Sequence, residues 1–176
     1  MRRLIKTVAL SAISIFLMCG TTNAQSRNKV RKLEYNSQYN YEVATLAVGV
    51  DGTKLVKVWG YGKKAEDAVR DAKAQGVACA IFRGFPAGSN GSAAPTPPIV
   101  TDPNAATTHE DYFVKFFEPG GKYLQYVNLS TDGVSTDRVK VNKKTYKVGV
   151  ELSIAYDELR KELERQGIAR KLNSGF

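Results

Sequence analysis

The sequence predicts an α+β fold: an antiparallel sheet of about four strands with helices on one face, built from two strand-strand-helix halves. Three observations support this prediction. An Asp51-Gly52 pair separates two β-rich runs, an alanine-rich amphipathic segment follows them, and a second pair of β-rich runs toward the carboxyl end also precedes a helical pattern. Strands that pair locally, with helices gathered on one face, are typical of α+β domains.

The first half opens with a predicted hairpin of strands at residues 41–50 and 54–62. Asp and Gly both tolerate the positive φ that a type I′ turn requires, so this dipeptide is a strong hairpin signal between β-rich runs. We therefore expect the two strands to pair in an antiparallel fashion.

A helix is predicted next, at residues 65–81. Small apolar residues recur there every three or four positions, and charged residues occupy the opposite face, which is the pattern of an amphipathic helix. A glycine inside a helix costs about 1 kcal/mol relative to alanine. We therefore expect Ala68, Ala72 and Gly76 to bring this helix close to the hairpin.

Residues 84–106 are rich in Pro, Gly, Ser and Ala and read as a partly ordered insertion. Structureless loops of this length are uncommon unless they are functional or disordered. We expect the insertion to add nothing to the core, and removal of residues 86–102 to cost little, because closure entropy changes by only about 0.6 kcal/mol per doubling of loop length.

Aromatic residues gather in the segments that follow. Residues 109–117 look like a short helix that ends before Pro119, and residues 122–129 form a second short segment; both could instead be strands. Exposed aromatic side chains anchor many recognition surfaces, so the group is the candidate recognition surface. The interpretation that we favour is that it closes the core. Its members are Tyr112, Phe113, Phe116, Phe117, Tyr123 and Tyr126.

The second half closes with predicted strands at residues 134–141 and 145–154. Apolar residues alternate with polar ones from Tyr146 to Ile154, as in a strand with one buried face. A helix is predicted from Tyr156, with acidic residues in its first turn, and Gly167 is its candidate C-cap.

The amino terminus predicts export. Residues 1–24 have a positive start, an apolar run too short to span a bilayer, and small residues before a cut at Gln25. Residues 25–38 form a basic leader, and residues 39–172 a single domain. We expect the protein in the periplasm, at the outer-membrane periphery or on the cell surface. The alternative is a lipoprotein anchored at Cys19, although Met18 fits poorly before a lipidated cysteine.

Composition limits the partners. Loss of Arg2, Arg3 and Lys6 with the signal lowers the formal net charge of +9 by three, to +6. The cations are scattered and form no arginine-aromatic footprint. We therefore expect peripheral membrane contact as a further interaction and no nucleic acid.

No residue pattern predicts catalysis, a cofactor or a metal. The chain has one histidine, His109, and after cleavage one cysteine, Cys79, too few for structural zinc. We interpret His109 as a polar residue near a helix start and Cys79 as a small buried residue. Gly60 and Gly62 precede a helix, but the phosphate-binding pattern needs a third glycine or a Gly-Lys-Ser/Thr ending.

Two segments resemble the amino-terminal domain of bacterial flagellar T-ring assembly proteins and related small envelope lipoproteins. One is the strand ending in Trp59-Gly60-Tyr61-Gly62 with the helix at residues 65–73; the other is the strand at residues 146–152 with the helix at residues 159–168. The resemblance implies a non-enzymatic module that helps to assemble a larger surface structure, with other envelope proteins as its partners. The chain departs from it in the insertion and in lacking a good lipidation site. The alternative function is a secreted binding domain for a polysaccharide or other small ligand.

Overall fold

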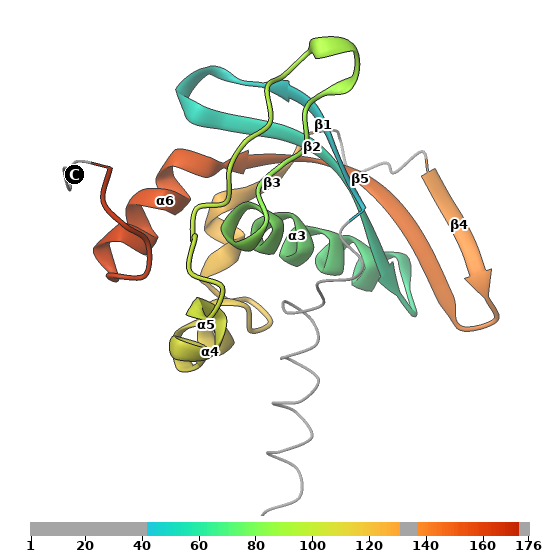
Figure 1. The fold of residues 1–176 in the computed structure, drawn as a ribbon. Coiled ribbons are helices and arrows are strands. Elements are labelled where there is room, and N and C mark those ends of the chain that lie inside the picture. The colour runs from blue at the N-terminus through green and yellow to red at the C-terminus, as the bar shows by residue number, and fades with distance from the viewer. Residues whose placement is uncertain (1–41, 131–136, 173–176) are drawn as a thin grey trace, which may run out of the picture.

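The computed structural model describes residues 42–130 and 137–172 (Figure 1). The predicted signal peptide, basic leader and Cys19 lie outside these residues, as does the start of the strand predicted at 134. The strands are β1 (Val43–Val48), β2 (Thr53–Gly62), β3 (Val127–Leu129), β4 (Asp137–Asn142) and β5 (Thr145–Ala155). The helices are α3 (Ala65–Phe82), α4 (Ala105–Thr108), α5 (Glu110–Phe116) and α6 (Tyr156–Arg165), with 3-10 turns η1 (Val50–Gly52), η2 (Ser89–Gly91) and η3 (Lys122–Tyr126).

The five strands form one antiparallel sheet around β5. The order is β1-β2-β5, and β4 and β3 lie end to end along the other edge of β5, so the sheet is four positions wide. Figure 1 shows the sheet curled, with the helices on its concave side. The predicted α+β fold, with a sheet of about four strands and helices on one face, is confirmed.

The predicted hairpin turn is present between β1 and β2. Asp51 has φ 62° and ψ 30°, Gly52 has φ 72°, and the Thr53 amide donates a hydrogen bond to the Val50 carbonyl. Positive φ at both central residues is the type I′ geometry that pairs two strands directly. The pairing runs from Val48–Lys54 to Val43–Val58.

Helix α3 lies very close to β2. A Cβ atom added at Gly60 would come closer than 3.0 Å to the Ala68 carbonyl oxygen and the Ala72 nitrogen, and one at Gly62 would meet the Ala68 nitrogen. Glycines on the strand and alanines on the helix are therefore both needed for this contact. The predicted close approach is confirmed, and it explains the glycine pair without a phosphate.

The core lies between α3 and the concave face of the sheet. Val56 and Val58 from β2 and Leu152 and Ile154 from β5 are fully buried there. Gly76 of α3 faces Leu152, Ile154 and Val58. Side chains from both halves of the chain join a single hydrophobic cluster.

Residues 84–106 contribute to the core, so the expectation that they add nothing was wrong. Phe85, Ile99 and Val100 are at most 4% exposed. The Ile99 and Val100 amides donate to the carbonyls of Ala80 and Ile81 at the end of α3, which have no partner within the helix. The composition of the segment did not indicate that it would contribute to the core, because its few apolar residues are outnumbered by Pro, Gly and Ser.

The carboxyl-terminal elements follow their predicted order. Residues of β5 alternate between the core and the outer face, and α6 buries Leu159 and Leu163. Gly167, at φ 71°, follows the end of α6, and the Ile168 amide donates to the Leu163 carbonyl, as in a glycine C-cap. The segment at 109–117 is helical, as expected, whereas 122–129 is a 3-10 turn followed by a short strand.

Candidate functional site

The aromatic group predicted as a recognition surface lies inside the molecule. Its rings contact one another and the end of α3; the Phe82 and Phe113 centroids, for example, are 5.0 Å apart. The favoured interpretation, that these rings close the core, is therefore confirmed, and the candidate recognition surface is not present on the outside of the molecule. Five of the six side chains, Phe113, Phe116, Phe117, Tyr123 and Tyr126, are at most 9% exposed, and only Tyr112 is partly exposed.

Cys79 and His109 occupy structural positions. Cys79 is 2% exposed, its thiol lies 3.0 Å from the Gly84 carbonyl oxygen, and burial raises its pKa to about 12. A thiol with this pKa is protonated at neutral pH and is a poor nucleophile. His109 is the N-cap residue of α5, without a side-chain capping bond. Both interpretations from the sequence are confirmed.

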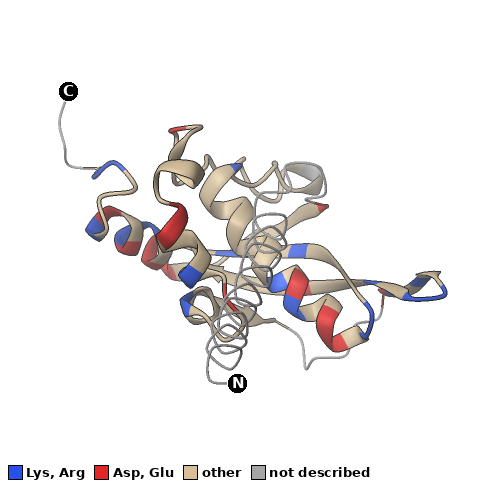
Figure 2. Ribbon diagram, turned by 90° about the horizontal axis from the view of Figure 1, so that it is seen from below, with Lys and Arg blue, Asp and Glu red and all other residues tan. Residues whose placement is uncertain are grey.

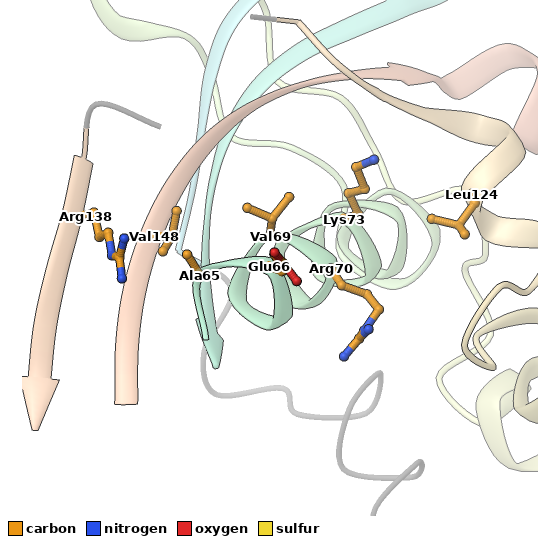
Figure 3. A pocket seen from close by; sticks show the side chains of 8 residues that line it. All are labelled: Ala65, Glu66, Val69, Arg70, Lys73, Leu124, Arg138 and Val148. Carbon is orange, nitrogen blue, oxygen red and sulfur yellow. The ribbon is translucent and has the colours of Figure 1, made fainter. Parts of the chain in front are cut away.

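An open groove runs along the exposed flank of α3. Its volume is about 550 Å³, within the usual range for ligand pockets. Figure 3 shows side chains from α3 in the middle, from β4 and β5 on one side and from η3 on the other. The lining residues are Ala65, Glu66, Val69, Arg70, Lys73, Leu124, Arg138 and Val148.

The groove exists because the helical layer does not cover the whole sheet. Helix α3 packs mainly on β2 and β5, and the concave face of the β4–β5 hairpin continues past it (Figure 1). Arg138 lies opposite Val148 in the strand register, so both side chains point to this concave face. On α3, Ala65 and Val69 are one turn apart and lie on the same side of the helix.

The rim of the groove is cationic. It holds three basic side chains and one carboxylate, that of Glu66. The Arg70 guanidinium pairs with Asp67 at 2.7 Å, and the Arg138 guanidinium lies over the Tyr146 ring, 4.4 Å from its centroid. Lys73 forms no ion pair with any residue that the structure describes. Figure 2 shows further basic residues at the projecting end of the β4–β5 hairpin.

The convex face of the sheet carries a second group of aromatic and basic side chains. The Trp59 ring lies over Gly149, and the ammonium groups of Lys57 and Lys147 are 5.3 and 4.8 Å from its centroid. Lys57 pairs with Asp137, and Lys147 pairs with Glu42. Both lysines are paired, whereas Lys73 of the groove has no ion-pair partner among the described residues, so we rank this face behind the groove as a binding site for an anionic partner.

Sequence reasoning missed the groove. Glu66, Arg70 and Lys73 were read as one solvated helix face, and Arg138 and Leu124 belong to segments far away in the sequence. The spacing of the charges on α3 was the only available signal, and most exposed helix faces share it.

Among the described residues, no three His, Cys, Asp or Glu side chains gather as metal ligands. No helix in the same part of the chain is long and apolar enough to cross a membrane. The chain matches no protein-family model, no curated protein and no solved structure.

Proposed function

We propose that this chain is a non-enzymatic exported protein of the cell envelope that acts as an assembly or interaction module. Its recognition site is the groove between α3, the β4–β5 hairpin and η3. The observation that carries the proposal is the uncovered concave face beside α3, where an apolar floor meets a cationic rim. Apolar surface bordered by polar groups is typical of docking sites.

The resemblance to flagellar T-ring assembly proteins supports the same class of function. The segments that carry it, β2 with α3 and β5 with α6, belong to one sheet-and-helix unit. A module of this kind acts by binding, and the burial of Cys79 and the capping position of His109 agree with that role.

A secreted binding domain for a polysaccharide or other small ligand is the second candidate. The groove volume of about 550 Å³ favours it, because a small ligand would fit such a space. The Trp59 ring on the convex face is a further aromatic group that a sugar could contact.

Photocrosslinking in cells separates the two candidates. A photoreactive phenylalanine derivative in place of Glu66 is expected to crosslink to an envelope protein, whereas the same group in place of the exposed Lys115 on α5 is not. Crosslinks of equal yield at both positions would contradict a groove-specific partner. Glycan-array binding that is lost when Lys73 and Arg138 are changed to Glu would instead favour the second candidate.

Export is tested separately by intact-mass analysis of the protein from fractionated cells. We expect a mature chain that begins at Gln25 and carries no lipid. A diacylated Cys19 at the amino terminus would place the protein on a membrane, and a retained Met1 in the cytoplasmic fraction would overturn the proposed export.

A further inference from the structure

We infer that the groove receives an amphipathic helix with acidic borders, contributed by a partner protein. This inference rests on the proposed function, and it names the chemistry of the partner at the same site. It follows from three features of the groove: the hydrogen bonding of the backbone around it, the incomplete helical layer over the sheet, and the placement of its cations.

The backbone around the groove favours a helix over an extended strand. One wall is the side of α3, whose amides and carbonyls bond within the helix, and the other is the face of the paired strands β4 and β5. A strand laid in the groove would find no backbone partners there, and unpaired buried backbone groups are costly. A helix satisfies its own backbone groups and needs only side-chain contacts.

The layer structure supports the same occupant. The concave face of the sheet is covered by α3 over β2 and β5, while the described residues leave a groove on the concave side of the β4–β5 hairpin beside α3. Packing a helix onto the face of a sheet is the usual way to bury such a surface. A helix alongside α3 would place its apolar stripe on the partly exposed Ala65 and Val69, above the buried Val148, and would complete the two-layer arrangement.

The placement of the cations favours several anionic groups over one. Figure 3 shows Arg70 and Lys73 extending from α3 in different directions, with Arg138 on the far side of the groove. They do not converge on a single point, as they would around one phosphate or one lipid headgroup. Carboxylates spaced along both borders of a helix match this distribution, in the manner of helix-in-groove recognition.

The test uses designed peptides and the isotope-labelled protein. The probe is a peptide of about 18 residues, five helical turns, with leucines at i, i+3, i+4 and i+7 spacing and glutamates on both flanks. Amide signals of Val69, Leu124 and Val148 are expected to shift on binding. A peptide in which lysine replaces every glutamate, and one with the same composition but no apolar face, are the controls.

Charge variants locate the binding. The double change Lys73→Glu with Arg138→Glu is expected to weaken binding about tenfold through the loss of two ion pairs. Lys115→Glu with Arg170→Glu alters the net charge equally at exposed positions away from the groove and should change the affinity less than about twofold. Thermal melts of all variants establish that they are folded.

A gain of affinity is expected from Glu66→Lys, which removes the carboxylate from the rim. Binding of the acidic peptide should strengthen about threefold, while the matched Glu118→Lys change at an exposed position should leave it unaltered. This variant tests the rim without disturbing Arg138 or its stacking on Tyr146.

Three outcomes would overturn the inference. They are equal binding of the glutamate and lysine peptides, binding of anionic phospholipid vesicles through the groove with no peptide binding, and concentration-dependent self-association that buries the groove. The proposed function would still be tested independently by the in-cell crosslink at position 66. A partner protein can bind in the groove without presenting an acidic helix.

Discussion

The amide nitrogen of Tyr61 donates a 2.8 Å hydrogen bond to the Asp71 carboxylate, which ties the end of β2 to the middle of α3. The same carboxylate oxygen accepts a bond from Gln75. Asp71 is therefore a carboxylate that serves a structural purpose in largely buried surroundings.

Burial raises the pKa of Asp71 above its ordinary value, and the hydrogen bonds from Tyr61 and Gln75 offset only part of this effect. A carboxyl group with a raised pKa in the folded state binds its proton more tightly there than in the unfolded chain. Its contribution to folding is therefore most favourable at low pH and declines as the pH rises from the unfolded pKa through the folded pKa.

Replacing Asp71 with asparagine removes this pH-dependent loss and keeps an acceptor for the Tyr61 amide. We expect Asp71→Asn to melt above the parent protein at pH 7, with the difference shrinking as the pH falls through the raised pKa toward the ordinary value of 3.8. Asp71→Ala leaves the Tyr61 amide unpaired and should cost about 1–3 kcal/mol. Melting curves at a series of pH values test both variants. An asparagine variant less stable than the parent at pH 7 would contradict the raised pKa of Asp71.

The contact between β2 and α3 is expected to be intolerant of any added atom. Gly60→Ala places a methyl group against helix backbone, which cannot rotate away, and overpacking of this kind typically costs about 1–3 kcal/mol. Ala72→Leu should be damaging for the same reason.

Urea denaturation measures both changes, with Cys79→Ser and His109→Ala as milder references. Cys79→Ser can keep the contact with the Gly84 carbonyl, and His109 makes no capping bond. The account of this contact fails if His109→Ala proves the most damaging of the four.

Residues 86–102 are expected to be necessary for stability. Ile99 is 3% exposed and sits at the end of α3, so Ile99→Ala should cost about 2–5 kcal/mol. Ala94→Ser, at an exposed position in the same loop, should stay within about 0.5 kcal/mol. Deletion of the whole loop should lower the melting temperature strongly; unchanged melting would restore the earlier view that the insertion is dispensable.

An ion pair with a buried carboxylate links α6 to η3. Glu162 is 3% exposed, accepts hydrogen bonds from Lys122 at 2.5 Å and from Gln166 at 3.1 Å, and also pairs with the exposed Arg165 of the same helix. Lys122→Met removes one partner of a buried carboxylate and should cost about 1–3 kcal/mol. Adding Glu162→Leu removes the buried charge as well, so we expect the double variant to be more stable than Lys122→Met alone. A double-mutant cycle in guanidinium chloride tests this, and additive losses would show that the pair is not coupled.

The parts of the fold that the sequence predicted depend on short-range patterns. Three such patterns are the Asp51-Gly52 turn, the small-residue stripe of α3 and the alternation along β5. Each is contained in a short segment of the chain, and the structure of that segment agrees with it. The contact of Gly60 with α3 was predicted only in part, since the alanines were assigned to it but Gly60 and Gly62 were weighed only as a phosphate-binding pattern.

The parts that could not be predicted depend on which distant segments meet. The local pairing of β4 with β5 was expected, but nothing in residues 127–129 indicates that they pair with the same edge of β5. The side on which Arg138 lies is set by register, and a shift of one residue would turn it to the convex face. Aromatic density likewise could not distinguish an exposed patch from a closed core, because the same side chains serve either purpose.

The position of β5 in the sequence has a consequence for how the protein is made. β5 is the strand that pairs with β2, β3 and β4, yet it follows all of them along the chain. During synthesis only the β1–β2 hairpin and α3 can form from neighbouring residues, and the remaining strands wait for a partner that has not yet emerged. Pairing between distant segments is also the slower kind. The nascent chain therefore stays incompletely folded until Thr145–Ala155 is available, an interval during which a translocation channel or a chaperone can still engage it.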